Sequence, residues 1–400
     1  MTALTHAQQN RSYESSNRSF VPKPVVALSD FGYATKRRAQ SELLEALGRD
    51  GFCFVESDDS SQDLHVLLSE LSRFFGSATD QEKSGLEMFR SGLCRGYFPP
   101  LEQNSRKLER RKERYVFSDR GNLFPGNYPL LEHAYDKLYS RHIKRIADIV
   151  NTSLHAYLEE TNSQWAKSFR QFFLDPYSGK LEPSVLSYAM HYPPLENFDE
   201  FLNPDQTITI SEPHVDITTF TILPRGTSGA TKMFDKAGEV IPIYDSSVPP
   251  DAILVFVGKT LEKLLEGIPF RNRNGSFPFM AFRHTVMNTP EEVMKGRDVV
   301  GYFFNGNLSR PYITAANAEP FGSMFIDRRP LAMKQHEPLS GDELTVKDRQ
   351  YLTEQLFFSD TSPNSASPRI TLKQFREFLN ASESRDRNSV QMPTCCENEC

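Results

Sequence analysis

The sequence predicts a mainly β protein with flanking helices, whose core is a barrel or jelly roll. Between residues 181 and 320, short runs rich in Val, Ile, Phe and Thr alternate with Gly, Pro and Asn turns. This texture is typical of a β-barrel or jelly roll rather than of a βαβ array. Before and after this region, apolar residues recur at helical spacing, which predicts supporting helices on either side of the β core.

The first part of the chain is predicted to be a disordered tail at residues 1–22, followed by an α/β region at residues 23–180. The tail is rich in Gln, Asn, Ser and Arg and offers few apolar anchors. Apolar spacing and a glycine just past a helix end define the next elements. They are a strand at Val25–Leu28, a helix at Lys36–Arg49, a strand at Phe52–Val55 and a helix at Leu64–Phe75.

The longest predicted element is an amphipathic helix from Leu131 to Leu158, which would support the β core. Its apolar residues recur mostly in steps of three and four, and one larger step is bridged by His142. His142 and His155 are interpreted as surface or core positions of this helix.

The β core itself is predicted at residues 181–320. Its candidate strands share β-branched and aromatic residues bounded by turn residues. They are Val185–Tyr192, Ile217–Leu223, Val240–Tyr244, Ile253–Val257, Phe279–Val286 and Val299–Phe304. A helical C-terminal extension is expected at residues 321–380 and a disordered tail at residues 381–400. No Gly-rich phosphate loop occurs in the sequence.

Composition and charge limit the classes of protein to consider. Of the 400 residues, 38% are hydrophobic and 24% charged, as in an ordinary globular protein. The net charge of −6 has no dominant basic block, which argues against a nucleic-acid partner. The basic cluster Arg106–Arg114 alternates with acidic and polar residues and is interpreted as a solvated face, with a mobile flap that carries charge toward a substrate as the alternative.

The expected compartment is the cytoplasm, without membrane association. Residues 1–23 lack the apolar segment of a signal peptide, and no stretch is apolar for long enough to cross a bilayer. Five cysteines, three of them at the end of the chain, make no disulfide framework. The final Cys395, Cys396 and Cys400 are interpreted as part of a frayed end, with metal binding or lipidation as weaker alternatives.

Three side chains form a candidate metal site. In His214-Val215-Asp216, residues two apart on a strand would project from the same face, so an imidazole and a carboxylate would lie side by side. His284, after another apolar stretch, would supply a third donor from a neighbouring strand. Two histidines and one carboxylate, with coordination positions left open, form the ligand set of non-haem Fe(II) oxygenases. Taken alone, this spacing also occurs by chance, and a single buried histidine is more often a core residue.

Several further segments occur in a recognisable order. They are Asp30–Gly32, Asp50–Val55, Arg95–Pro99, Lys112-Glu113 with Phe117, His191–Pro194, His214–Leu223 and His284–Asn288. Together these segments, from about Val25 to Tyr312, resemble the isopenicillin N synthase-like family of Fe(II) oxygenases, most of which use 2-oxoglutarate. The resemblance implies a double-stranded β-helix (jelly roll) core. It also implies a dioxygenase that needs Fe(II), O₂ and 2-oxoglutarate as co-substrate, and that oxidises a small-molecule substrate with release of succinate and CO₂.

The resemblance also assigns roles to individual residues. His214, Asp216 and His284 would be the iron ligands. Arg297 would grip the distal carboxylate of 2-oxoglutarate, a task that suits the planar, permanently charged guanidinium. The hydroxyl of Tyr192 could reach the co-substrate or the substrate, although a core aromatic role is an equal alternative.

The sequence departs from the family pattern after His284. Val299 stands where the family carries a serine whose hydroxyl binds the co-substrate, and the interval between His284 and Arg297 is longer than usual. Arg310 is therefore a second candidate for the co-substrate arginine. Arg95 would anchor a substrate carboxylate, or else be a solvent-facing turn residue.

Two other functions remain open. Because of Val299, the protein could be an iron- and O₂-dependent oxidase or cyclase of the isopenicillin N synthase type that does not use 2-oxoglutarate. Alternatively, the fold could serve as a non-catalytic binding module, with the extension after Phe321 meeting a protein partner.

Overall fold

The computed structural model describes residues 23–305, apart from residues 33, 87–95, 101–104, 119–121, 123, 163–165, 168, 171–183, 217 and 235–237. The predicted tails at residues 1–22 and 381–400 and the predicted helical extension at residues 321–380 lie outside the described residues. So do Arg95, Arg310 and the three C-terminal cysteines.

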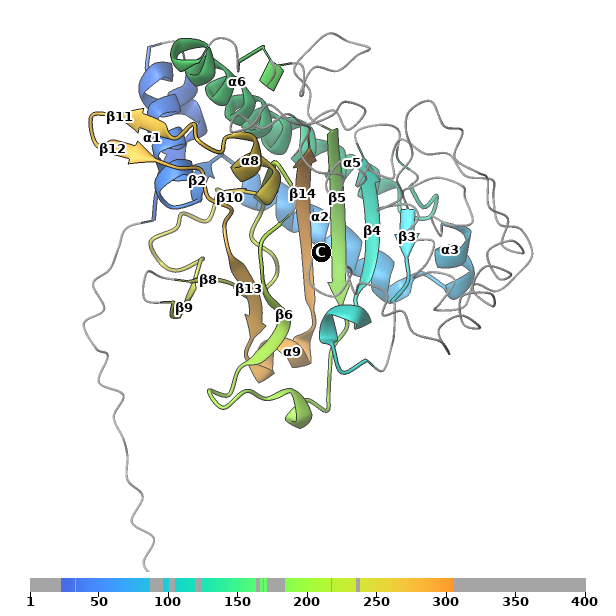
Figure 1. The fold of residues 1–400 in the computed structure, drawn as a ribbon. Coiled ribbons are helices and arrows are strands. Elements are labelled where there is room, and N and C mark those ends of the chain that lie inside the picture. The colour runs from blue at the N-terminus through green and yellow to red at the C-terminus, as the bar shows by residue number, and fades with distance from the viewer. Residues whose placement is uncertain are drawn as a thin grey trace, which may run out of the picture.

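The largest element of the fold is an eight-stranded sheet (Figure 1), in the order β1-β2-β10-β7-β14-β5-β4-β3. Apart from the parallel pair β1 and β2, neighbouring strands are antiparallel. The strands are β1 Val25–Ala27, β2 Phe52–Glu56, β3 Gly96–Phe98, β4 Glu113–Ser118, β5 Ser184–Tyr192, β7 Phe220–Leu223, β10 Ala252–Val257 and β14 Arg297–Asn305.

A four-stranded sheet of order β6-β13-β8-β9 lies across one face of the larger sheet. Its strands are β6 Ile208–His214, β8 Thr231–Phe234, β9 Val240–Pro242 and β13 His284–Asn288, and a separate hairpin joins β11 Phe270–Asn272 to β12 Gly275–Phe277. Two facing antiparallel sheets form the jelly roll that the sequence predicts.

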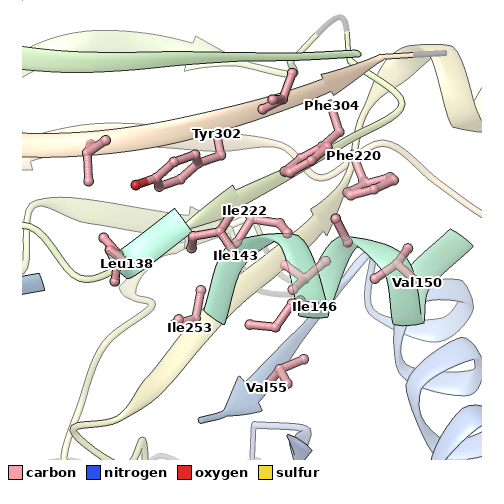
Figure 2. Close-up of a cluster of buried hydrophobic side chains, with 14 of the residues drawn as sticks. Val55, Leu138, Ile143, Ile146, Val150, Phe220, Ile222, Ile253, Tyr302 and Phe304 are labelled. Carbon is pink, nitrogen blue, oxygen red and sulfur yellow. The ribbon is translucent and has the colours of Figure 1, made fainter. Parts of the chain in front are cut away.

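Helices cover the other face of the large sheet. They are α1 Lys36–Arg49, α2 Ser60–Ser77, α3 Asp80–Gly85, α5 Pro129–Leu138 and α6 Lys144–Thr161, with the short α8 Lys259–Leu264 and α9 Pro290–Lys295 elsewhere. Figure 2 shows strand side chains such as Phe220, Ile222 and Tyr302 facing Ile143 and Ile146. These residues are completely buried. Burial of this apolar face fixes the helices on the sheet.

The predicted long helix is present, but it has one irregularity that was not predicted, at the larger apolar step. A π-helical turn, Tyr139–Ile143, joins α5 to α6. The extra residue in this turn accommodates the larger apolar step, so that Leu138 and Ile146 both face the core. His142 in the turn is buried and binds Asp63 and Ser57, which makes it a core residue.

Alternation along the strands separates an outer from an inner face of the large sheet. In β14, Val300, Tyr302 and Phe304 belong to the core beneath the helices. Val299, one residue out of phase, belongs to a second apolar cluster between the two sheets. Side chains of a strand alternate between faces, so Arg297 shares the inner face with Val299.

Some predicted strand limits were wrong. The predicted strand Phe279–Val286 begins only at His284, and the predicted strand Ile217–Leu223 begins at Phe220. Phe279 and Phe282 are nevertheless buried, because they pack as irregular backbone against the core. An apolar run marks burial, and hydrogen-bond partners decide whether it becomes a strand. Among the described helices, none is both long and apolar enough to span a membrane.

Candidate functional site

Two histidines face each other across the smaller sheet. His214 ends β6 and His284 begins β13, and the two residues are direct partners in the antiparallel ladder. Their ring centroids lie 4.3 Å apart. Two positions far apart in the sequence therefore present two imidazoles side by side.

Asp216 completes the cluster from a position just after β6. The sequence argument placed His214 and Asp216 on one strand, and this was wrong, because the strand ends at His214. Asp216 Oδ1 still lies 3.7 Å from His214 Nε2 and 3.9 Å from His284 Nε2. Its other oxygen, Oδ2, accepts a hydrogen bond of 2.7 Å from the hydroxyl of Thr221. This bond turns Oδ1 toward the two imidazoles.

Backbone carbonyls fix the tautomers of both histidines. His214 Nδ1 lies 2.7 Å from the carbonyl oxygen of Glu212, and His284 Nδ1 lies 3.2 Å from that of Phe282. A carbonyl can only accept, so each Nδ1 carries the proton and donates it. Each Nε2 then offers a lone pair toward Asp216, which is the arrangement that metal-binding histidines require.

The surroundings of His284 keep its ring neutral. Phe256 and Phe282 pack against the imidazole at centroid distances of 5.0 and 5.8 Å. This burial lowers the pKa of His284 to about 4, against the opposing attraction of Asp216. At neutral pH the ring is therefore a ligand and not a cation.

The cluster fits a divalent metal ion. The three ligand atoms of His214, Asp216 and His284 all lie within 4.8 Å of one another. Metal bonds of about 2.0–2.2 Å to nitrogen and oxygen bring neighbouring ligand atoms to roughly 3 Å, so small side-chain rotations suffice. The donor set of two imidazoles and one carboxylate matches non-haem Fe(II) centres better than structural zinc, which takes four protein ligands.

Arg297 is a buried cation that has no anionic partner among the described residues. Its side chain starts at the first residue of β14, beside Tyr192 of β5, and the residue is only 4% exposed. Nε is buried without a hydrogen-bond partner, and no carboxylate within the described residues forms an ion pair with the guanidinium. Burial accordingly lowers the pKa of Arg297. A buried guanidinium in this state is suited to an anionic ligand.

A cavity of about 350 Å³ opens beside Arg297. It lies at the Arg297 end of the space between the sheets, and the three metal-ligand candidates are not part of its wall. The wall includes Tyr192, Ile210, Asn288, Val293 and Arg297. Tyr192 is 9% exposed and its ring lies 5.5 Å from Arg297 Cζ. Tyr192 is therefore both a packed aromatic residue and a neighbour of the candidate anion site.

The long interval between His284 and Arg297 is filled by α9. Thr289 and Glu292 form a capping box at its start, and Gly296 ends it with a φ of 74°. A Cβ at Gly296 would come within 2.9 Å of the Tyr192 carbonyl oxygen. Glycine is required here because only it adopts this φ and permits this approach. The inserted helix thus still delivers Arg297 to the start of β14, where the sequence argument placed it.

Val299 is completely enclosed by apolar side chains. It is 1% exposed and belongs to the inner cluster with Tyr192 and Ile210. The position carries no hydroxyl, so any ligand of Arg297 must find its remaining hydrogen bonds elsewhere. Asn288, whose side chain accepts a long hydrogen bond from Ser228, is a polar group in the cavity wall.

A partly buried ion pair near the candidate metal ligands was not predicted from the sequence. Glu109 and Lys112 lie 3.1 Å apart, and Glu109 also accepts a hydrogen bond of 3.3 Å from Ser211 of β6. Lys112 is 8% exposed, so the interpretation of residues 106–114 as a solvated face was wrong for this residue. The signal in the sequence was a basic residue leading into an apolar strand, where a charge needs a partner.

His191, which neighbours Tyr192 on β5, points to the opposite face of the strand and has a structural role. Its Nδ1 lies 2.7 Å from Asp298 Oδ1, and its ring stacks on Phe75 on the outer face. It is not part of the metal cluster.

The fold is shared with solved oxygenase structures. A putative 2OG-Fe(II) oxygenase family protein from Caulobacter crescentus aligns with a TM-score of 0.55 and 18% identity over 83% of this chain and 98% of its own. A full-length protein from Neurospora crassa, in complex with alpha-KG and 5-formyluracil, aligns with a TM-score of 0.53 and 16% identity over 84% and 96% of the two chains. A putative oxygenase from Shewanella oneidensis aligns with a TM-score of 0.52 and 18% identity over 72% of this chain and 92% of its own.

No protein-family model and no curated protein matches the sequence. The structural likeness confirms the jelly-roll fold that the sequence resemblance implied.

Proposed function

We propose that this chain is a non-haem Fe(II) oxygenase that couples the decarboxylation of 2-oxoglutarate to the oxidation of a small-molecule substrate. The observation that carries the proposal is the pairing of two sites inside one jelly roll. One is the cluster of His214, Asp216 and His284, and the other is buried Arg297, which no carboxylate in the described ranges pairs with. An ordinary structural metal site would not need the second.

The three ligands would hold Fe(II) and leave coordination positions open. Bound there, the ion would supply the one-electron chemistry that activates O₂. The chain's own contribution is placement. The carbonyls of Glu212 and Phe282 orient the two imidazoles, and Thr221 orients the carboxylate. Phe256 and Phe282 keep water away from His284.

Arg297 would hold the distal carboxylate of 2-oxoglutarate. This carboxylate would satisfy the buried guanidinium, including the Nε that lacks a partner. Tyr192 borders the same cavity and would add a hydroxyl. That the structural relative from Neurospora crassa was solved with alpha-KG supports the assignment for this fold, and its further ligand 5-formyluracil supports a small-molecule substrate. A cytoplasmic location remains a prediction from the sequence.

Anaerobic calorimetry tests the proposal. Fe(II) should bind the full chain with one-to-one stoichiometry, and 2-oxoglutarate should bind tightly only to the iron-loaded protein. Asp216→Ala should abolish both events, and Asp205→Ala, on an exposed turn, serves as the control. When O₂ is admitted to the iron-loaded protein in the presence of 2-oxoglutarate, the 2-oxoglutarate should be converted to succinate. The absence of iron binding in the wild type would rule out the oxygenase and favour a binding module.

One observation favours a second candidate, an iron- and O₂-dependent oxidase or cyclase that does not use 2-oxoglutarate. Val299 removes the hydroxyl expected beside Arg297 and leaves an apolar wall. In this case the guanidinium of Arg297 would bind the carboxylate of the substrate instead of that of 2-oxoglutarate. Substrate-dependent O₂ consumption that is unaffected by 2-oxoglutarate would identify this activity.

A further inference from the structure

A second arginine that has no ion pair within the described part of the chain, Arg114, lies on the inner face of the large sheet. Side chains of β4 alternate between faces, and Tyr115 and Phe117 pack in the outer core beneath the helices. Arg114 therefore points inward. Its partner across the ladder is Met190 of β5, which packs against the inner cluster.

The contacts of Arg114 leave its charge uncompensated. The guanidinium carbon lies over the ring of Phe98, 4.0 Å from its centroid. Nε is buried without a hydrogen-bond partner, and Arg114 makes no ion pair with any residue that the structure describes. The ring occupies one side of the guanidinium and leaves its edge available to a planar anion.

The other charges of the inner face already have partners. Lys112, two residues before Arg114, is paired with Glu109. Burial opposes the charge of Lys112, but the attraction of Tyr192 and Glu109 outweighs it and raises its pKa, so the lysine stays protonated. The proposed function assigns Asp216 to the metal ion and Arg297 to 2-oxoglutarate.

Arg111, at the edge of the cavity, has different contacts. Its Nε donates to the carbonyl oxygen of Ser105 over 2.7 Å, and its guanidinium lies 5.1 Å from the ring centroid of Phe201. Of these inner-face cations, Arg114 therefore remains as the one that has an orphaned N–H and no assigned anion.

We propose that Arg114 binds the carboxylate of the primary substrate, so that the substrate is an organic acid. This inference rests on the proposed function, because it treats Arg297 as the site of 2-oxoglutarate. A single uncompensated charge matches a monoanion. A carboxylate also matches the flat, forked donor edge of the guanidinium better than a spherical anion does.

The residues next to Arg114 indicate the rest of the substrate. Two residues after Arg114 on β4, and on the same face of the sheet, Val116 pairs with Tyr188 of β5. The ring of Tyr188 packs edge-on against Phe303 of β14 at 5.2 Å. The apolar or aromatic part of an acid bound to Arg114 would therefore contact these inner-face side chains.

The test uses matched neutral and anionic probes. The full chain is loaded anaerobically with Fe(II) and saturating 2-oxoglutarate, and titrated with a panel of acids and their primary amides, from acetate and acetamide to phenylacetate and phenylacetamide. We expect the larger acids to bind and their amides to bind at least about tenfold more weakly, because the amide lacks the charge that Arg114 neutralises.

Single substitutions test whether the preference for acid over amide depends on Arg114. Arg114→Gln should remove the preference for acid over amide, and Arg114→Lys should keep part of it. Arg73→Gln is the matched control, since Arg73 also lies over an aromatic ring, that of Tyr128, but is on α2 on the outer face. The affinity for 2-oxoglutarate should be unchanged in all three variants, and thermal unfolding checks that each is folded.

The outcomes separate this inference from the proposed function. If no acid of the panel binds better than its amide, or if Arg114→Gln keeps the preference, the assignment of Arg114 is wrong even when 2-oxoglutarate still binds. If Arg114→Gln loses 2-oxoglutarate instead, Arg114 holds the co-substrate and this inference fails. If the wild type binds no 2-oxoglutarate, the proposed function itself fails.

Discussion

The hydroxyl of Thr221 donates a 2.7 Å hydrogen bond to Oδ2 of Asp216. Thr221 lies on β7 of the large sheet, whereas Asp216 follows β6 of the small sheet. The bond therefore joins the two sheets at the metal-ligand cluster. It leaves Oδ1 as the oxygen that faces the two imidazoles. A second buried hydroxyl, that of Thr218, lies 3.0 Å from Thr221 and extends the chain of hydrogen bonds.

Thr221→Val should weaken Fe(II) binding about 10- to 100-fold, because loss of a hydrogen bond that orients a ligand lets the carboxylate rotate. Valine keeps the shape of the side chain. Anaerobic Fe(II) titration measures the effect. Thr285→Val is the matched control, since its buried hydroxyl donates over the same 2.7 Å, but to the carbonyl of Ser211 and not to a ligand. Equal losses in the two variants would argue against an orienting role for Thr221.

Arg297→Met should stabilise the ligand-free protein and remove its response to 2-oxoglutarate. The substitution replaces a buried charge without a partner by an apolar side chain of similar length. In the iron-loaded wild type, 2-oxoglutarate at 100 times its dissociation constant should add about 2.7 kcal/mol to the free energy of unfolding. Anaerobic thermal unfolding with and without 2-oxoglutarate checks both effects. Equal stabilisation of wild type and variant by 2-oxoglutarate would show that Arg297 is not its anchor.

Val299→Ser should strengthen 2-oxoglutarate binding up to about tenfold, since it restores a hydroxyl on the face of Arg297. The same change should lower the free energy of unfolding by about 1–3 kcal/mol, because a buried apolar side chain is lost. Val300→Ser on the outer face is the control, with a similar loss of stability and no change in affinity. Unchanged affinity in Val299→Ser would favour the oxidase that does not use 2-oxoglutarate.

Asp63→Asn should destabilise the fold by about 1.5–3 kcal/mol at neutral pH, because it removes the charge from a buried acceptor that binds Lys137 and His142. The Asp63 side chain is 1% exposed and contacts Lys137 at 2.8 Å and His142 at 3.0 Å. Burial alone would raise the pKa of Asp63, but the hydrogen bonds from Lys137 and His142 outweigh it and lower the pKa.

This direction sets the pH dependence of the Asp63 contribution. A carboxyl with a lowered pKa in the folded state contributes its full stability above its unfolded pKa of about 3.9 and loses it as the pH falls through the folded value. The difference in stability between wild type and Asp63→Asn should therefore be constant from about pH 7 to 5 and shrink below about pH 4. Urea unfolding at several pH values measures it. A difference that persists unchanged at low pH would contradict the assigned charge state.

Several parts of the site could be predicted from the sequence because they depend on local patterns. His214, Asp216 and His284 stand out by residue type beside apolar runs, and the structure places their ligand atoms together. Helix α1 matches its predicted limits, since apolar spacing and a terminal glycine define both ends. Arg297 could be placed at the start of a strand despite the longer interval, because the apolar run that follows continues β14.

The residues that the sequence argument missed act through distant partners. In the sequence, Thr221 looks like an ordinary strand residue. Its hydrogen bond to Asp216 forms because the fold brings β7 next to the end of β6. Lys112 and Arg114 were interpreted as part of a solvated basic cluster. Only the pairing of β4 with β5 turns Arg114 toward the inner face, and only tertiary packing buries Lys112. A basic residue beside an apolar strand indicates a charge that needs a partner, but only the folded structure shows whether Lys112 and Arg114 each have one.

By itself, the sequence determined which residues can bind a metal and which runs are apolar, because side-chain chemistry and hydrophobic period are local properties. Only the tertiary structure decided that Asp216 reaches the two imidazoles from outside a strand and that Val299 faces the same space as Arg297. It also decided that Arg297 is buried and Arg114 partly buried, both without anionic partners among the described residues. These facts follow from the packing of two sheets on each other. Burial and charge compensation are properties of that contact and not of any one segment.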